Sequence, residues 1–196
     1  MTTMKEAKYL EKTGTYMTPA GRMVYAALFK PTTMKGETDQ SKAKYQITLL
    51  LPADADISVL EKAVEHARNE KWTPGVQRTS KIRSPFLKTA DSPRLAEYAD
   101  EFPLMLRFNS KSRPGVKTKA LADVSEADEP DDIYNGRWCR VTCSPFAYDQ
   151  AGNKGVSLGL GNVQLLDHAD RIVGGAARAS DEFEAVGDDA LEDMVG

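Results

Sequence analysis

Residues 134–166, YNGRWCRVTCSPFAYDQAGNKGVSLGLGNVQLL, contain the pattern that decides the fold. Two runs that alternate between apolar and other residues flank a polar, glycine-rich stretch, DQAGNKG, at 149–155. Successive side chains of a strand point to opposite faces, so these runs predict two long antiparallel strands joined by a turn. Asn135-Gly136 is a second turn signal, placed just before the first strand.

The two faces of this hairpin differ in composition. One face of the first strand should join the core, and its members are Cys139, Val141, Cys143 and Ala147. The other face carries three aromatic rings and an arginine: Trp138, Arg140, Phe146 and Tyr148. Small residues continue that face in the second strand: Ser157, Gly159 and Gly161. A β-bulge near Gly161-Asn162 would return Val163 and Leu165 to the core side.

The aromatic face has two interpretations. Bases of single-stranded nucleic acid stack on such rings, which contributes about 1–3 kcal/mol per base. Alternatively, Trp138, Phe146 and Tyr148 cover a second small core or a subunit interface. The hairpin taken alone leaves both interpretations open.

Charge is distributed unevenly along the 196 residues, whose formal net charge is −3. Residues 181–196 contain seven acids and no base, and six further acids lie within 123–132, DVSEADEPDD, which we expect to be a solvated loop. All 26 bases therefore lie in residues 1–180, where they exceed the 22 acids by four. A basic body with an acidic tail suggests a polyanionic partner and a built-in competitor for it.

The remaining pattern predicts one mainly β domain over residues 22–175, preceded by a polar leader at 1–21 and followed by a flexible acidic tail at 176–196. Strands are expected at 22–30, 45–51 and from 104, where Leu104, Leu106 and Phe108 form a core face. A helix should begin at Asp56 or Ser58, with Ser58 and Glu61 spaced as a capping box, and Trp72 packed near its end. A short helix is expected at 92–102, with Pro93 in its first position.

Two segments hold bases without acids. The first is 77–89, QRTSKIRSPFLKT, which also contains Phe86. The second is 103–119, which runs from a strand through Pro114-Gly115 and holds five bases. Such a run is usually a solvated face, yet this arrangement favours an edge along which phosphates lie.

The order of these pieces resembles a known family. An apolar strand, a strand ending in TLLLP, a helix, a basic strand ending in SKSRPGV and an acidic loop precede YNGRW and FAYDQAGNKGVSLGL. The chain is similar to phage-type single-stranded-DNA-binding proteins. The resemblance implies an OB-fold Greek-key barrel with an inserted α-helix and a disordered acidic C-terminal tail. It also implies sequence-independent binding during phage replication, recombination or repair, a tail that contacts replication or recombination proteins, and in some members a homodimer.

The candidate site follows from both lines of reasoning. Rings expected to stack bases are Trp138, Phe146 and Tyr148, with Tyr25 and Phe86 as additions. Bases expected to meet phosphates are Arg107, Lys111, Arg113, Lys117, Arg140 and Lys154. The tail residues expected to compete with DNA are Asp181, Glu182, Phe183, Glu184, Asp188, Asp189, Glu192 and Asp193. The tail departs from several of its kind because it ends in Met194-Val195-Gly196 instead of an aromatic residue.

Two rival classes of function remain. The six acids of 123–132 could in principle bind Mg²⁺, as in a nuclease, but metal sites of that type draw carboxylates from separate rigid strands. We therefore expect no enzyme, no catalytic residue, no metal and no cofactor. A structural or assembly protein would instead use the aromatic hairpin as a subunit interface.

Location follows from what the sequence lacks. No apolar run approaches the roughly 20 residues that span a bilayer, and the start lacks the apolar centre of a secretory signal. We expect a cytoplasmic protein without membrane contact, in the host cytoplasm if a phage encodes it. Cys139 and Cys143, four apart in one strand, are too distant for a disulfide and should be small core residues.

Overall fold

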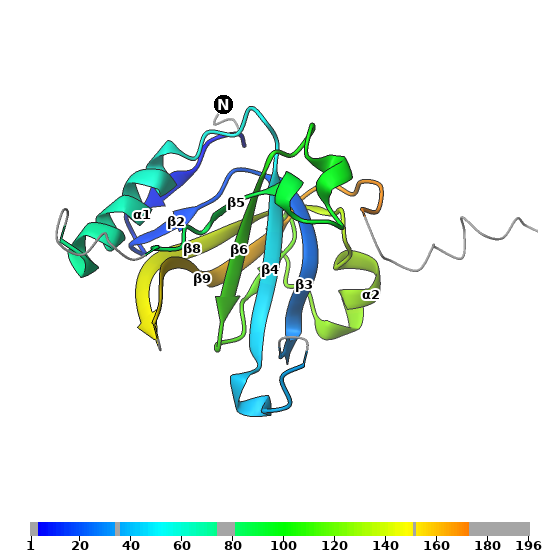
Figure 1. Ribbon diagram of the computed structural model, residues 1–196. Coiled ribbons are helices and arrows are strands. Elements are labelled where there is room, and N and C mark those ends of the chain that lie inside the picture. The colour runs from blue at the N-terminus through cyan, green and yellow to red at the C-terminus, as the bar shows by residue number, and fades with distance from the viewer. Residues whose placement is uncertain (1–3, 34–35, 74–80, 151, 173–196) are drawn as a thin grey trace, which may run out of the picture.

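The computed structural model of the chain describes residues 4–33, 36–73, 81–150 and 152–172 (Figure 1). Its core is built from five strands: β3 (Gly21–Thr32), β4 (Lys44–Leu51), β6 (Leu104–Ser110), β8 (Trp138–Gln150) and β9 (Asn153–Leu165). The expected acidic tail, 176–196, lies outside the described residues. No helix within the described part is long and apolar enough to cross a membrane.

The five strands close into a barrel. β3 pairs antiparallel with β4, and β4 with β6, while β6 runs parallel to β9. β9 then pairs antiparallel with β8, which returns to β3 through Gly21–Cys139 and Arg22–Trp138. The order β3-β4-β6-β9-β8-β3 is the Greek-key order of an OB-fold, so the predicted fold class is confirmed.

Shorter elements extend this barrel. Two further strands lie on its flanks, namely β5 (Phe86–Lys88) on β6 and β7 (Val116–Lys117) on β9. α1 (Ser58–Lys71) joins β4 to the segment before β5, and α2 (Glu129–Asp132) precedes β8. The remaining elements are single 3-10 turns: η1 (Gln40–Lys42), η2 (Thr89–Asp91), η3 (Ala96–Tyr98) and η4 (Glu126–Asp128).

The N-terminal leader is part of the sheet. β1 (Lys8–Leu10) and β2 (Thr15–Met17) form a hairpin, and β2 pairs with β8 through Tyr16–Cys143 and Met17–Thr142. Residues 8–17 of the leader thus extend the sheet that forms the barrel. Short polar strands of three residues give little periodic signal, which explains why the sequence pattern missed them.

The hairpin of β8 and β9 contains the β-bulge that the sequence predicted. Val141 lies opposite Val163, whereas Cys143 lies opposite Leu160, so β9 contains one extra residue at 161–162. This bulge returns Val163 and Leu165 to the buried side. At the bulge Asn162 has no partner residue in the pairing of β8 with β9. Its backbone amide donates instead to Thr142 Oγ1 at 2.7 Å.

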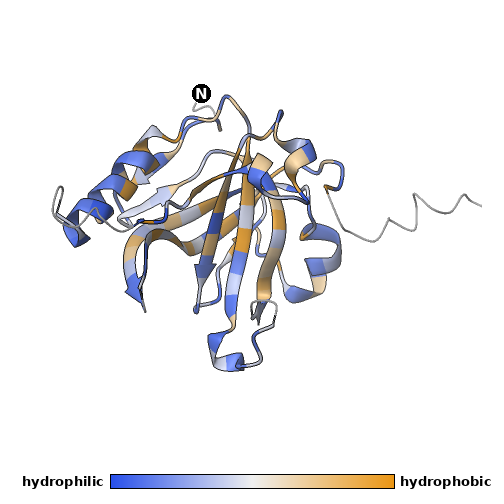
Figure 2. Ribbon diagram, viewed as in Figure 1, coloured by the Kyte–Doolittle hydropathy of each residue, from blue (hydrophilic) through white to orange (hydrophobic). Residues whose placement is uncertain are grey.

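Two apolar clusters hold the structure together, and hydrophobic and hydrophilic residues alternate along the strands that form them (Figure 2). The larger cluster fills the barrel with side chains that include Met23, Leu49, Phe108 and Val141, and α1 adds Leu60 and Val64 to it. Trp72 is 3% exposed and packs there, as predicted. The smaller cluster lies on the outer face of β3, β4 and β6, and consists of Val24, Leu50, Leu95, Phe102, Met105 and Ile172.

Two predicted helix features are wrong. Residues 92–102 do not form a helix, because the chain wraps over the outer face of the sheet to bury Leu95 and Phe102, with η3 as a single turn. Isolated helices of this length are marginal, so packing decides the conformation. α1 begins at Ser58 as expected, but the capping box is absent: Asp56 Oδ1 accepts from the Ser58 amide at 2.9 Å, and Ile57 is the N-cap.

Both cysteines are free and buried, as expected for small core residues. Burial raises the pKa of the Cys143 thiol to about 12, and burial also raises the pKa of Cys139. A thiol with a raised pKa stays protonated and unreactive at neutral pH.

Candidate nucleic-acid interface

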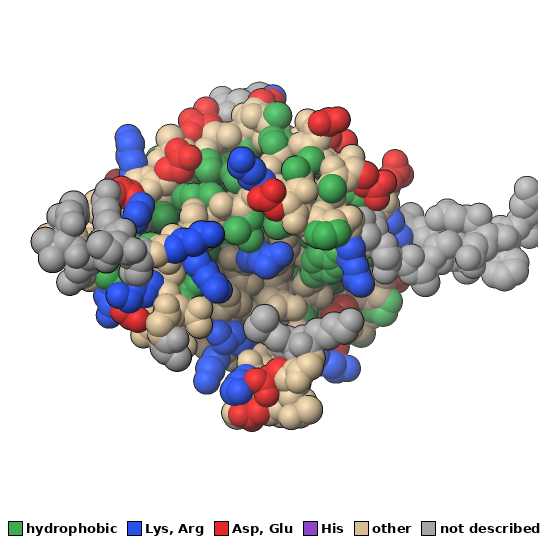
Figure 3. Space-filling model, in the orientation of Figure 1, with side chains coloured by type: hydrophobic (Ala, Val, Ile, Leu, Met, Phe, Trp, Pro, Cys, Tyr) green, Lys and Arg blue, Asp and Glu red, His purple; other side chains and the backbone are tan. Residues whose placement is uncertain are grey.

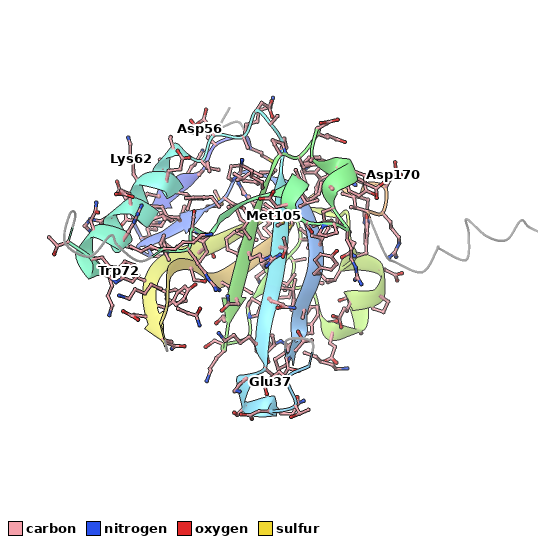
Figure 4. The ribbon with its side chains drawn as sticks, in the orientation of Figure 1. Glu37, Asp56, Lys62, Trp72, Met105 and Asp170 are labelled. Carbon is pink, nitrogen blue, oxygen red and sulfur yellow. The ribbon has the colours of Figure 1, made fainter. Side chains whose placement is uncertain are left out.

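The outer face of the barrel is half covered and half open. Its upper half carries the smaller apolar cluster, where Met105 lies beneath the segment 89–102 (Figure 4). Below that cover the side chains become polar. Arg107 lies opposite Thr48, while Asn109 lies opposite Gln46 and beside Gly159 of β9. This is the face of the second and third barrel strands, which OB-folds use to bind oligonucleotides.

A hollow of about 680 Å³ opens on this face, and we call it the groove. Its lining comes from β6, from both strands of the β8–β9 hairpin and from the segment that leads into β5. The lining residues are Lys81, Arg83, Ser84, Pro85, Phe86, Leu87, Arg107, Asn109, Tyr148, Val156 and Ser157. Figure 3 shows Lys and Arg side chains gathered around a hollow on the same face. The groove thus unites three predicted site residues: Phe86, Arg107 and Tyr148.

The segment before β5 forms one wall of the groove. β6 and β9 pair only through Phe108–Leu158 and Asn109–Gly159. On the side of these pairs that precedes them in both strands, β6 and β9 separate and leave a gap, which we call the wedge. Residues 83–88 fill that wedge. The Arg83 amide donates to the Lys154 carbonyl at 2.9 Å, and the Val156 amide donates to the Arg83 carbonyl at 3.0 Å. Further along, Phe86 lies opposite Leu106 of β6.

Two aromatic rings of β8 lie over glycines of β9. The ring of Phe146, 45% exposed, lies 3.7 Å from the place where a Cβ on Gly159 would stand. A Cβ on Gly155 would come within 2.6 Å of Tyr148 Oη. Glycine at 155 therefore leaves room for the Tyr148 ring, whereas the Phe146 ring is at ordinary contact distance from position 159. Phe146 is exposed and Tyr148 is half-buried, and rings supported in this way are suited to stacking on bases.

Three basic residues near the groove were not among the predicted site residues. Lys81 and Arg83 lie on its rim, and Lys44 Nζ reaches Asn109 Oδ1 at 3.4 Å. The signal that could have found them was the basic segment 77–89 and the base-rich loop before β4. Their place in the site depends on the wedge between β6 and β9, which no local pattern reveals.

Trp138 lies away from the groove. It is the first residue of β8, its ring centroid is 6.1 Å from that of Phe102, and the Arg22 guanidinium lies 5.3 Å from the Trp138 centroid. Partial burial lowers the pKa of Arg22. In addition, Arg22 donates to the carbonyls of Gly136 and Asp170. Trp138 packs against the smaller apolar cluster, an arrangement that favours the alternative interpretation of this ring.

Other predicted residues are spread around the barrel. Arg140 donates from Nε to Gln164 Oε1 at 2.8 Å, and Lys117 pairs with Asp123 at 2.6 Å, so these two lie together over a shallow apolar hollow beside Met17. Arg113 lies over the ring of Phe29 at 5.0 Å. The structure does not bring these three bases to the groove.

Three further predicted site residues, Lys111, Lys154 and Tyr25, do not line the groove. Hydrogen bonds from Ser41 lower the pKa of Asp39, beside η1, and the nearby charge of Lys111, which follows β6, adds a smaller effect in the same direction. Lys154 lies at the tip of the β8–β9 hairpin, 3.7 Å from Asp149. Tyr25 is 38% exposed at an irregularity of β3 with φ of +53°, and its amide donates to Asn135 Oδ1.

The acidic segment is largely exposed, as expected for a solvated segment, but it contains η4 and α2 and is not a simple loop. Its carboxylates bind protein partners: Asp123 pairs with Lys117, Glu126 with Lys30 at 2.8 Å, and Asp128 forms a capping box with Ser125. Asp132 pairs at 2.9 Å with the buried Arg137, which also donates to the Leu166 carbonyl. In the described part of the chain, no group of three or more His, Cys, Asp or Glu side chains is placed to hold a metal ion.

A closed OB-fold barrel with a cationic, aromatic groove between its third strand and the β8–β9 hairpin is typical of oligonucleotide-binding OB-fold proteins. Comparison with models of protein families identifies the family within this class. The family of the Enterobacter phage Enc34 ssDNA-binding protein matches residues 15–195, and the chain belongs to this family. The comparison with curated protein sequences gives no significant match.

Solved structures share the fold. The single-stranded DNA-binding protein of bacteriophage Enc34 with a C-terminal truncation gives a TM-score of 0.70 at 20% identity, covering 86% of this chain and 93% of that one. The Enc34 protein in complex with ssDNA gives 0.62 at 21% identity, over 83% and 91% of the two chains. The single-stranded DNA-binding protein gp2.5 of bacteriophage T7 gives 0.54 at 16% identity, over 88% and 98%.

Proposed function

We propose that this protein binds single-stranded DNA in the groove, without preference for an overall sequence. The observation that carries the proposal is the groove itself, where Arg107 of β6 and Tyr148 of β8 line one open hollow on the nucleic-acid face of an OB-fold. Membership of a family of ssDNA-binding proteins supports it. No catalytic step is part of the proposal.

Binding combines two physical effects. Bases stack on Phe146 and Tyr148, while the backbone phosphates lie near Lys81, Arg83 and Arg107. Stacking tolerates any base because every base has a π-face, so it gives affinity without a sequence code. In duplex DNA the bases already stack on each other and are held in pairs, so they are not available to stack on Phe146 and Tyr148. The protein therefore favours single strands and stabilises DNA that has opened.

The acidic tail is proposed to compete with DNA for the groove. Its seven carboxylates lie outside the described residues, and the proposal rests on their number and on the basic body of the chain. Deletion of residues 181–196 should raise the affinity for single strands, most of all at low salt, because exposed charges are screened beyond about 8 Å at physiological ionic strength. An unchanged affinity would leave the tail only a solubilising role.

The biological setting follows from the family. We propose action in phage replication, recombination or repair in the host cytoplasm, with the tail as the contact for replication or recombination proteins. A homodimer belongs to the same proposal. Sedimentation of the full chain with and without single-stranded DNA tests that part, because a monomer under both conditions would contradict it.

The binding proposal is tested by fluorescence anisotropy with labelled oligo-dT and a matched duplex at two salt concentrations. We expect tight, salt-sensitive binding to the single strand and much weaker binding to the duplex. Equal affinity for the single strand and the duplex would mean that the protein binds DNA only through a basic surface, without stacking of bases. Absence of binding even after tail deletion would contradict the proposal and favour an assembly role for the aromatic hairpin.

A further inference from the structure

A second hollow lies behind the wall of the groove, between α1 and the segment 82–86. Its volume is about 310 Å³. It shares Arg83, Ser84, Phe86 and Val156 with the groove, so the two hollows are separated only by one stretch of chain. A nucleotide of a strand lying in the groove therefore has this second hollow next to it.

One side of the second hollow is polar and comes from a single face of α1. Glu61, Glu65 and Arg68 lie at successive turns of the helix and line the hollow together. Arg68 Nη1 lies 3.5 Å from Glu65 Oε2. Arg68 Nε is buried and, among the residues that the structure describes, it has no hydrogen-bond acceptor. The Arg68 side chain as a whole is 34% exposed, so the other nitrogens of its guanidinium can donate to a ligand that offers an acceptor.

The other side is apolar. Val64 and Val156 are 8% and 4% exposed, and the partly buried Ile82 and Phe86 complete this side. Apolar walls facing a few placed polar groups suit a flat ring whose edge carries donors and acceptors. The charged side chains of the hollow balance, because two acids, Glu61 and Glu65, face two bases, Arg68 and Arg83. A balanced site has no net attraction for phosphate, which favours an uncharged nucleobase as the occupant.

We propose that the second hollow receives one nucleobase with an exocyclic amino group, turned out of the strand that lies in the groove. The amino group donates to the carboxylate of Glu65, and an adjacent ring nitrogen accepts from the partly exposed guanidinium of Arg68, whose Nη1 lies 3.5 Å from Glu65 Oε2. Carboxylates pair in this way with the N4 amino group of cytosine. Thymine and uracil place a carbonyl oxygen where the amino group would be, and that oxygen faces the carboxylates unfavourably.

This inference rests on the proposed function and adds a local base preference to it. The test compares two oligonucleotides of on the order of 16 nucleotides, the upper range of OB-fold site sizes. Both are oligo-dT, with either dC or dU at the central position. dU is the proper reference because it lacks the methyl group of thymine, as dC does. We expect the dC oligonucleotide to bind about five-fold more tightly, a modest preference for a paired polar contact.

Variants of the hollow make the test specific. Glu65→Met removes the acceptor and Arg68→Met removes the donor, and each should bring the dC-to-dU affinity ratio close to one. Glu70→Met is the matched control: this exposed glutamate of the same helix pairs with His66 and does not line the hollow, so the ratio should persist. Because a lost carboxylate changes affinity for both oligonucleotides, the ratio is the quantity that decides.

Three outcomes would overturn the inference. Equal affinity of the native chain for the two oligonucleotides would remove the base preference and leave the proposed function intact. A ratio that persists in both Glu65→Met and Arg68→Met would place the preference elsewhere. Failure to bind either oligonucleotide would overturn the proposed function, and the inference with it.

Discussion

The hydroxyl oxygen of Tyr148 lies 2.6 Å from the place where a Cβ on Gly155 would stand. The two residues are opposite each other on β8 and β9. An alanine at 155 must therefore push the Tyr148 ring off the hairpin. Gly155→Ala should reduce the affinity for oligo-dT by about 5- to 150-fold, as expected for the loss of one stacked base, and anisotropy titration measures this loss.

A double-mutant cycle shows whether the ring is the cause. In a Tyr148→Ala background, Gly155→Ala should cost much less affinity, because the clashing ring is gone and only a 3.0 Å approach to Arg83 Cβ remains. Equal losses in both backgrounds would mean that Gly155→Ala acts through the backbone of the hairpin and not through Tyr148.

Two aromatic residues of β8 should respond differently to truncation. Phe146 is 45% exposed beside the groove, so Phe146→Ala should weaken DNA binding with little change in stability. Trp138 packs against Phe102 and Arg22, so Trp138→Ala should lower the free energy of unfolding by roughly 3 kcal/mol and leave the affinity of the folded protein nearly unchanged. Urea unfolding and anisotropy on the same preparations check both expectations, and the reverse pattern would place the stacking site at Trp138.

Arg107 should contribute to both affinity and salt dependence. It lies exposed on the floor of the groove, so Arg107→Ala should weaken binding and reduce the slope of log K against log salt by about 0.7, the value for one phosphate contact on a single strand. Lys62→Ala is the matched control. Lys62 lies near Asp56 at the start of α1, outside the groove, and its loss should leave the slope unchanged (Figure 4). Equal slopes for both variants would contradict the role of Arg107.

The acidic segment should make stability depend on pH. The hydrogen bond and the charge of Lys30 hold the pKa of Glu126 below its ordinary value. A carboxyl with a lowered folded-state pKa stabilises the fold above its unfolded-state pKa of about 4.3, and this contribution is lost as pH falls through the folded-state pKa. Glu126→Gln should therefore show a smaller loss of stability than the native chain when pH falls from neutral to acid.

Urea midpoints at a series of pH values measure this difference. Glu97→Gln, at an exposed carboxylate of η3, controls for the removal of one charge and should follow the native chain. Parallel curves for the native chain and Glu126→Gln would contradict the stabilising role of the pair. The effect should be small, because both partners are exposed and solvent screens them.

The hairpin of β8 and β9 shows how far the sequence predicts this fold. Strict alternation fixed which side chains enter the core, and the mismatch at Gly161-Asn162 located the bulge. The elements that were missed or wrong are short and non-periodic: the β1–β2 hairpin and the turns at 89–102 form because they pack on the barrel. Local pattern carries no information about such contacts.

The candidate site was predictable only in part, for the same reason. Alternation placed Arg107 and Tyr148 on outward faces, but which outward face is open depends on the cover that 89–102 gives to one half of it. Trp138 packs against Phe102 of this cover, whereas Tyr148 lines the open groove. Likewise, Lys117 belongs to a basic run in sequence, yet in space it pairs with Asp123 on a different part of the barrel.

The most direct test of the account is to find which side chains touch a bound single strand. Oligo-dT carrying photoreactive 5-iodouracil, bound to the full chain and irradiated, would be followed by peptide mass spectrometry. We predict crosslinks at Phe146, Tyr148 or Phe86, which line or border the groove. Crosslinks confined to Trp138 or to the face around Arg140 and Lys117 would contradict the assignment of the groove as the DNA-binding site.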